Sequence, residues 1–265
     1  MHAQHWIVRI RPMWRVLLLF ALVLPDASFA QQDVPQANPG RPTVSTPATL
    51  TPIGYLQFEV GGFGATDSPD FSTRTNGIAV VKLTVQSRLQ LLFESEPVVH
   101  TNAEIKQTKL GDAFVGFQAV VAGGEHGHPT LSVSLLHKFR EAGVPEVDFG
   151  APRNSALVLL SGDLSGFHFD ANALANELEE TSRRAQFGQT LSISHPVRRF
   201  TVSGEIWHFT QPFLNEHAVG NLWALSYPLR RNIVLDGGFD HGLTKTSTHW
   251  EAFVGFTYLL PHKLW

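Results

Sequence analysis

Apolar and polar residues alternate one by one along most of the chain beyond residue 53. Residues 131–140 read LSVSLLHKFR, and residues 187–194 read FGQTLSIS. Successive side chains of a β-strand lie on opposite faces, so each of these segments would have one apolar and one polar face. The spacing of a helix fits neither segment well. The pattern therefore predicts a protein built from β-strands.

Runs of this kind predict about twelve strands. We place them at residues 53–64, 76–86, 88–97, 110–122, 129–140, 154–162, 164–174, 185–195, 198–209, 219–228, 231–241 and 248–260. A tilted strand needs roughly 9–11 residues to cross a bilayer, and the predicted strands are close to this length. Strands of soluble proteins usually have only about 5–6 residues. The sequence thus favours an all-β fold, a closed antiparallel transmembrane β-barrel, over a secreted β-sandwich or jelly roll.

The connections between these strands alternate in length. Short connections fall at residues 86–88, 162–165, 196–199 and 229–231, and long polar ones at 65–75, 97–109, 141–153, 175–184, 210–218 and 242–247. The connection at 123–128 is of medium length where a short one is expected. Bacterial outer-membrane barrels have short periplasmic turns and longer outer loops. An even number of strands also lets the first and last strands pair, which removes an edge that hydrocarbon does not tolerate.

Residues 1–30 have the layout of a cleavable secretory signal. Three arginines precede an apolar run, VLLLFALVL, at residues 16–24, and Ala30 follows as a small residue at the expected cleavage position. The run is shorter than the ~20 residues of a membrane-spanning helix, although a retained signal anchor is the alternative. We expect cleavage after Ala30, export, and location in the outer membrane of a Gram-negative-type cell.

Residues 31–52 contain five prolines, with Gln, Asn, Ser and Thr between them. Such a composition cannot bury a core and tends to extended conformations. We expect a disordered periplasmic leader, and the sequence leaves open whether it hangs free or plugs the barrel. The predicted organisation is a signal peptide at 1–30, a leader at 31–52 and a barrel at 53–265.

Charge and composition narrow the possible partners. Charged residues make up 16% of the chain, against about 25% in soluble domains, and the net charge is −3, so no basic surplus points to nucleic acid. The chain has no cysteine, which excludes disulfides and thiolate metal sites. Aromatic residues near strand ends fit the girdles that barrels place at the membrane interfaces. These residues are Trp207, Trp223, Tyr227, Trp250 and Tyr258.

The polar face of the predicted strands carries mixed charge, and ionisable residues at bilayer depth avoid the lipid face. We therefore expect these side chains in the lumen: Glu59, Lys82, Arg88, Glu94, Glu96, Asp112, Lys138, Arg140, Asp170, Glu205, Asp236, Asp240 and Glu251. The sharpest candidates for selectivity are two pairs, each on one strand face: Glu94 with Glu96, and Lys138 with Arg140. Ordinary solvated lumen residues, or charges that pair and fill a narrow interior, are the alternatives.

The sequence offers little for catalysis or metal binding. Ser194 and His195 are adjacent, and adjacent residues of a strand point to opposite faces, so they do not form a catalytic dyad. No GxSxG motif is present. His126 and His128 flank a glycine in a turn, where solvated side chains are a better interpretation than a metal site. We expect no enzymatic activity, no metal and no cofactor.

The last predicted strand resembles the terminal strand that the outer-membrane assembly machinery recognises. Residues 250–260 read WEAFVGFTYLL, with Gly255, Tyr258 and Leu260 at matching spacing, and the chain ends on the aromatic residue Trp265. The resemblance departs from the usual pattern two residues before the glycine, where a phenylalanine replaces a polar residue. It implies that these residues form an assembly signal.

Two further segments carry a family resemblance. Residues 111–119 read GDAFVGFQA, and residues 232–244 read NIVLDGGFDHGLT. Together with the chain end they resemble the outer-membrane transporter family named for the meta-cleavage pathway of phenol degradation. The resemblance implies uptake of small compounds, aromatic ones among them, and offers no catalytic residues.

Three functions are therefore considered. The first is an outer-membrane channel or facilitator for passive uptake or efflux of small hydrophobic or aromatic molecules. The second is a closed structural or adhesion barrel that binds partners through its outer loops, and the third is a lipid-modifying enzyme. The expected partners are outer-membrane lipid, the assembly machinery during insertion and a small-molecule solute.

Overall fold

A computed structural model describes residues 35–124, 128–145, 147–148, 152–179 and 182–265. The predicted signal peptide and its cleavage position lie outside these residues. Among the residues described, no helix is long and apolar enough to cross a membrane.

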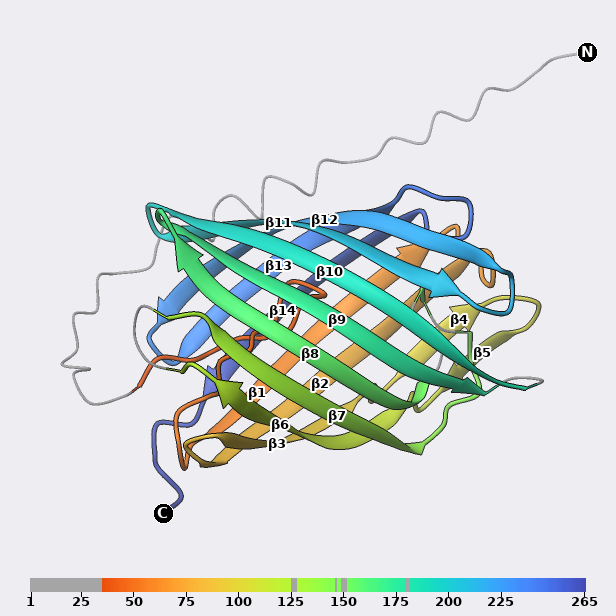
Figure 1. Ribbon diagram of the computed structural model, residues 1–265. Helices are drawn as coiled ribbons and strands as arrows, with labels where there is room; N and C mark the ends of the chain where they lie inside the picture. The colour runs from red at the N-terminus through yellow and green to blue at the C-terminus, as the bar shows by residue number, and fades with distance from the viewer. Residues whose placement is uncertain (1–34, 125–127, 146, 149–151, 180–181) are drawn as a thin grey trace, which may run out of the picture. The chain divides into compact units, whose positions relative to one another are not determined.

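In the described part of the chain, fourteen strands form one antiparallel sheet, and twelve of them close into a barrel (Figure 1). The barrel strands are β1 (Leu56–Thr66), β2 (Thr73–Gln86), β3 (Leu89–Ser95), β6 (Ala113–Ala122), β7 (Thr130–Arg140), β8 (Pro152–Leu164), β9 (Phe167–Glu179), β10 (Arg183–Val197), β11 (Phe200–Gln211), β12 (Glu216–Arg230), β13 (Ile233–Gly242) and β14 (Trp250–Leu259). The all-β barrel and its twelve strands, predicted from the alternation, are confirmed.

The barrel closes because β1 pairs on both sides. Gly61 of β1 lies opposite Gly255 of β14 and opposite Ile78 of β2, and all three strands run antiparallel. No barrel strand is therefore left with a free edge, which satisfies the backbone groups of the first and last strands.

The connections define two ends of the barrel. At the turn end, residues 87–88, 165–166, 198–199 and 231–232 are short links, and residues 123–129 form the one longer connection. At the loop end, residues 67–72, 96–112, 141–151 and 243–249 are long. Two connections predicted to be long, at 175–184 and 210–218, are short in the structure. The strands continue through them, as the pairing of Arg183 with Glu179 and of Gln211 with Glu216 shows.

One loop-end connection contains a hairpin that the sequence analysis did not predict. Strands β4 (Val99–Asn102) and β5 (Lys106–Lys109) extend the sheet beyond the barrel, because β4 pairs with the first residues of β2. In Figure 1 the hairpin marks the loop end, opposite the C-terminus.

Side chains are sorted by the two faces of the sheet. On β10, Thr190 and Ser192 are buried inside the barrel, whereas Leu191 and Ile193 are 42% and 48% exposed on its outer surface. This polar-inside, apolar-outside order reverses that of a soluble β-sandwich, whose core lies between its sheets. Trp207, predicted for an interfacial girdle, is instead 3% exposed and lies inside, since it shares the inward face of β11 with Glu205.

Candidate functional site: a plugged lumen and its chamber

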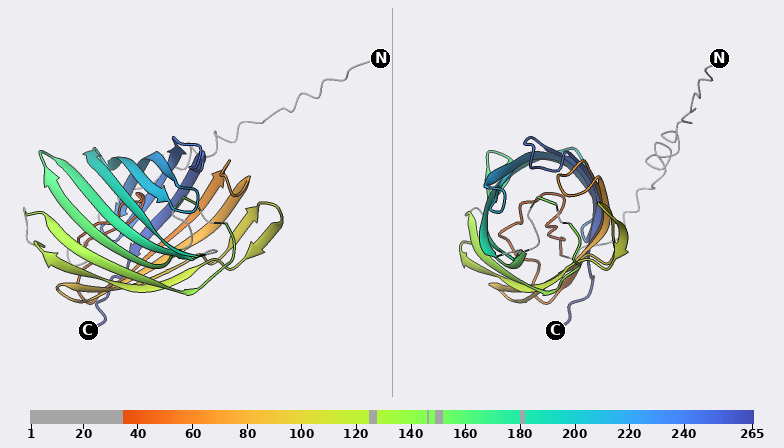
Figure 2. Two further views of the ribbon diagram at one scale, coloured as in Figure 1. Left: turned by 45° about the vertical axis from the view of Figure 1, so that its right-hand side comes forward. Right: turned by 90° about the vertical axis from the view of Figure 1, so that its right-hand side faces the viewer.

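Residues 35–52, here called the plug, lie inside the ring of strands (Figure 2, right). The sequence analysis expected these residues to be disordered and left open whether they enter the lumen. They have no regular secondary structure, but the polar inner wall supplies partners for their backbone groups. The prediction of disorder considered only what the segment can bury by itself. It did not take into account the hydrogen-bond partners that the polar inner wall of the barrel supplies.

The first part of the plug is held by charged side chains near the turn end. The backbone N–H of Gly40 donates to Glu59 at 3.0 Å, and Glu59 also pairs with Lys82 at 2.6 Å. Arg41 pairs with Asp236 of β13, with an N–O distance of 3.0 Å. Two of the predicted lumen residues, Glu59 and Asp236, are therefore partners of the plug.

Glu205 of β11 anchors the middle of the plug. Its carboxylate accepts the backbone N–H groups of Val44 and Ser45, both at 2.7 Å, and the Ser45 hydroxyl at 2.5 Å. Thr46 and Asn172 then exchange a reciprocal pair of hydrogen bonds at 2.6 and 2.9 Å. Each of these bonds satisfies a group that would otherwise be buried without a partner, which is costly.

The last part of the plug runs back to the turn end. The N–H of Ala48 donates to the Ser161 hydroxyl at 2.6 Å, and its carbonyl accepts the Ser132 hydroxyl at 2.5 Å. The N–H of Thr51 donates to Gln90 at 2.9 Å. The chain enters β1 through Gly54, whose φ of +79° is a left-handed conformation that favours glycine.

Two glycines of the wall make room for Arg41. A Cβ on Gly61 would lie 2.7 Å from the Arg41 guanidinium carbon, and a Cβ on Gly255 would lie 2.8 Å from Arg41 Nε and 2.7 Å from the Val60 carbonyl oxygen. Gly255 was singled out in the sequence as part of an assembly signal. In the structure it also borders the plug, a contact that the sequence analysis did not foresee.

Beyond the plug, towards the loop end, the lumen contains a chamber of about 410 Å³. Plug residues 41–44 and 46 line its side towards the turn end. Its wall is largely apolar, with aromatic side chains from four strands, β1, β6, β11 and β14. The aromatic residues are Phe63, Phe114, Trp207, Phe209 and Phe253. A volume of this size is within the range of small-molecule pockets.

Carboxylates also line the chamber: Glu94, Glu96, Asp112, Asp148, Asp240 and Glu251. Asp148 belongs to the β7–β8 connection and reaches the opposite wall, where its backbone carbonyl accepts the side-chain amides of Gln186 and Gln211. Its side chain accepts the N–H of Thr248 at 2.9 Å. Burial raises the pKa of Asp148 to about 7, although the bond from Thr248 opposes this shift.

The predicted selectivity residues do not form one cluster. Strand β6 separates β3, which carries Glu94 and ends directly before Glu96, from β7, with Lys138 and Arg140. Glu96 pairs with Arg74 at 2.8 Å, and Lys138 pairs with Asp112 at 2.6 Å. Glu94 and Glu251 line the chamber without an ion pair among the described residues.

Four predicted residues lie away from the chamber. Arg88 is in the exposed β2–β3 turn, where it donates to the Val121 carbonyl, so it does not line the lumen. Tyr258 lies on β14, and Leu260 follows it and donates its N–H to Leu56. Trp265 is exposed at the chain end. Their role in assembly stays a prediction.

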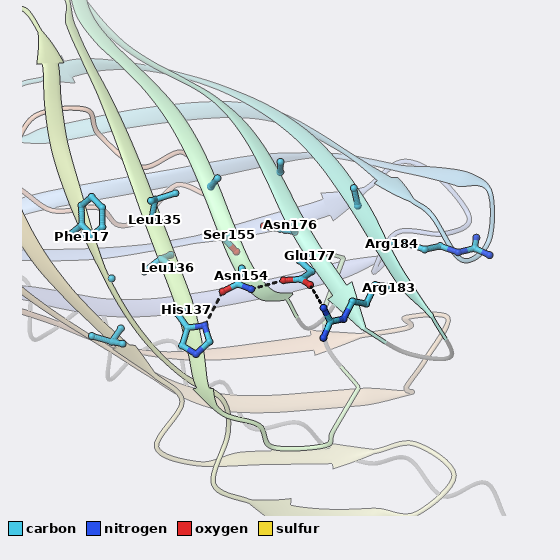
Figure 3. Close-up of a pocket in the computed structure, with 15 residues that line it drawn as sticks. Phe117, Leu135, Leu136, His137, Asn154, Ser155, Asn176, Glu177, Arg183 and Arg184 are labelled. Carbon is cyan, nitrogen blue, oxygen red and sulfur yellow. Dashed lines mark hydrogen bonds and ion pairs between the residues drawn. The ribbon is translucent and has the colours of Figure 1, made fainter.

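A second hollow, about 820 Å³, lies on the outer surface of β6 to β10 (Figure 3). Near the loop end a polar chain crosses it, from His137 through Asn154 and Glu177 to Arg183. The imidazole Nδ1 of His137 lies 2.8 Å from Asn154 Oδ1, and Arg183 lies 3.6 Å from Glu177. These side chains face outward, and Val115, the cross-strand partner of His137, is exposed on the same surface. They mark where the apolar outer surface gives way to polar residues.

The described residues offer little support for metal binding or for catalysis by a serine and a histidine. Among them, no group of three or more His, Asp or Glu side chains could hold a metal, and His126 lies outside them. His195 Nδ1 lies 2.9 Å from the Gly166 carbonyl oxygen, in the turn between β8 and β9. Ser194 is the residue before His195 in β10, so its side chain points to the opposite face of the sheet.

Two solved structures with a similar fold are a porin and a channel. The NanC porin aligns with 77% of this chain and 100% of its own, with a TM-score of 0.56 and 14% identity. The COG4313 outer membrane channel from Pseudomonas putida F1 aligns with 85% of this chain and 100% of its own, with a TM-score of 0.60 and 11% identity. No protein-family model and no curated protein matches the sequence. At these identities the likeness establishes the β-barrel fold.

Proposed function

We propose that this protein is an outer-membrane channel for passive passage of small molecules, and that displacement of the plug controls passage. The observation that carries the proposal is the sorting of side chains around a closed barrel, with a polar lumen and a chamber inside it. Direction of transport, uptake or efflux, follows the solute gradient, because the described residues include no device for coupling energy.

The outer surface supports location in a bilayer. Leu191, Phe187, Val254 and Phe256 are among the many large apolar side chains exposed there. In water such a surface would aggregate, whereas in lipid it is solvated. Outer-membrane lipid is accordingly the proposed surroundings, with the assembly machinery acting during insertion.

The plug supports control of passage. It is held by hydrogen bonds and ion pairs, such as those of Glu205 and Asp236, rather than by a continuous apolar interface. Water can replace polar contacts of this kind, which involve charged groups, at a net cost of about 1.5–3 kcal/mol each. The family resemblance adds the proposal that the solutes include hydrophobic or aromatic compounds.

A reversible covalent lock tests this proposal. Ser45 Oγ lies 2.7 Å from Thr190 Oγ1, and the chain has no cysteine, so the double variant Ser45→Cys, Thr190→Cys would carry the only two thiols. The measurement is ion conductance in a planar bilayer, before and after reduction with dithiothreitol. We expect current steps from the wild type, none from the oxidised variant, and recovery of steps on reduction.

The single variant Ser45→Cys is the matched control and should conduct under both conditions. If the oxidised double variant conducts like the wild type, the plug does not control passage. If the wild type, the reduced variant and a chain without residues 35–52 are all silent although inserted, the channel proposal fails. The second hypothesis, a closed structural or adhesion barrel, then becomes the better one, since a plug would stabilise such a barrel.

A further inference from the structure

Carboxylates outnumber lysine and arginine side chains in the lining of the chamber. Arg41 is the only lysine or arginine among the described residues that line it, against six carboxylates. Two of these carboxylates, Glu96 and Asp112, are in ion pairs. Glu94, Asp148, Asp240 and Glu251 have no ion pair within the part of the chain that the structure describes. An acidic surface surrounded by apolar walls attracts cations strongly, because the walls focus the field.

Asp240 and Glu251 are the closest pair of these acids in the sheet. They are direct cross-strand partners in the register of β13 and β14, and both side chains lie on the inward face. Like charges directly opposite one another on a sheet are destabilising. Arg74 approaches Glu251 from β2, but it forms the ion pair with Glu96. A cation between the two carboxylates would relieve their repulsion.

Asp240 also has an acceptor without a donor. Its Oδ2 accepts the indole N–H of Trp207 at 2.6 Å, which fixes the carboxylate at the chamber wall. Its Oδ1 is buried and finds no hydrogen-bond partner among the described residues, and the whole residue is 3% exposed. Buried acceptors in native structures nearly always have a donor. The missing donor points to a ligand that brings N–H groups into the chamber.

The aromatic side chains of the chamber suit the same kind of ligand. A cation within about 6 Å of a ring centroid is attracted to the ring face. The chain's own cations already use two of these rings, since Arg41 lies 5.8 Å from the centroid of Phe253 and Lys138 lies 5.7 Å from that of Phe114. Trp207, which donates its indole N–H to Asp240, is a further aromatic residue in the lining of the chamber.

We infer that the chamber binds small organic cations, amines whose ammonium group lies between Asp240 and Glu251 and whose apolar body packs on the aromatic wall of the chamber. The inference names the solute class of the proposed channel and so rests on that function. It distinguishes protonated amines from neutral and anionic aromatic compounds of the same size, which the apolar walls alone would not do.

The test compares benzylammonium, benzyl alcohol and benzoate, which share a ring and differ in charge. Binding to the folded chain in detergent is measured by equilibrium dialysis at pH 8, with empty micelles as the blank. We expect benzylammonium to bind at least tenfold more tightly than the other two. Asp240→Asn, which keeps an acceptor for Trp207, should remove most of that preference. Glu216→Gln, which changes an exposed acid at the loop end, should leave it unchanged.

Equal binding of the three compounds, or an unchanged preference in both Asp240→Asn and Glu251→Gln, would overturn the inference. Reversal potentials measured in bilayers then distinguish failure of the amine-binding inference from failure of the channel proposal. Current without a preference for benzylammonium over benzoate, together with equal binding, contradicts the inference and leaves the channel intact. Selective binding without current contradicts the channel and leaves the chamber's ligand class standing.

Discussion

The two halves of the lumen use the same kind of side chain in different ways. In the turn-end half, Glu205 and Asp236 accept hydrogen bonds or ion pairs from the plug. In the loop-end half, Glu94, Asp240 and Glu251 line a chamber that the plug does not fill. The barrel wall is acidic in both halves. The difference is that the plug supplies N–H groups and Arg41 to Glu205 and Asp236, whereas Glu94 and Glu251 have no ion pair within the described residues.

This difference shows how the lumen of a barrel of intermediate size can be filled at one end and still contain a chamber at the other. Small barrels are filled by side chains, and much larger ones leave a channel. Here the plug, a segment without regular secondary structure, fills the turn-end half. The loop-end half keeps Glu94, Asp240 and Glu251 without an ion pair in the described part of the chain.

The largest expected effect is release of the plug by Glu205→Leu. Leucine has a similar size but accepts no hydrogen bond, so the N–H groups of Val44 and Ser45 lose their acceptor. A buried donor without a partner costs about 1–3 kcal/mol, and every ~1.4 kcal/mol changes an equilibrium tenfold. We expect the open probability in bilayers to rise at least tenfold.

Glu94→Leu is the matched control from the other half of the lumen. Glu94 lines the chamber and makes no hydrogen bond to the plug in the described residues. Its replacement should alter ion selectivity and leave the open probability within twofold of wild type. Equal open probabilities in the two variants would mean that the plug is not held chiefly by Glu205, and the division between the halves would lose its basis.

A smaller effect is expected from Gly255→Ala, which acts on the plug through space rather than charge. The added methyl group would lie 2.7 Å from the Val60 carbonyl oxygen and 2.8 Å from Arg41 Nε. Arg41 must shift, which weakens its pair with Asp236. Overpacking of this kind costs typically ~1–3 kcal/mol. We expect a lower midpoint of thermal unfolding, followed by circular dichroism, and a moderate rise in open probability.

Gly62→Ala provides the comparison, because a Cβ there would meet no atom within 4 Å. It should leave both the unfolding midpoint and the current unchanged. Should Gly255→Ala lower the amount of inserted protein without changing the current of inserted molecules, its role would lie in assembly, as the sequence resemblance implies, and not in holding Arg41.

The twelve strands could be predicted from the sequence because the alternation is a local property. Thr190 and Ser192 face the lumen and Leu191 and Ile193 face outward wherever the strand is placed. The same phase could have placed Trp207 inside, since it lies two residues from Glu205 on one strand. It could also have extended β9 through Asn176 and Leu178, which are both buried.

The partners of the lumen residues could not be predicted in this way. Arg41 and Asp236 are 195 residues apart in the chain, and their meeting depends on the path of the plug through the barrel. Lys138 was expected to line a pore. In the structure it forms an ion pair with Asp112, which directly precedes the neighbouring strand β6. Asp148 carried no local signal at all, because it reaches the chamber from a connection between strands.

The smallest expected effect concerns the charge of Asp148. With a pKa of about 7, its side chain is mostly neutral at pH 6 and mostly charged at pH 8, so the chamber gains negative charge as the pH rises. Asp240 and Glu251 of the wall and nearby Asp70 add to the local field. We expect the cation-to-anion permeability ratio, measured from reversal potentials, to increase about twofold to threefold over this interval. Asp148→Asn should reduce the rise, and Glu216→Gln, whose side chain is exposed, should keep it. A wild-type ratio that falls as the pH rises would contradict the expected gain of negative charge, and with it the assignment of an acidic chamber to the loop-end half.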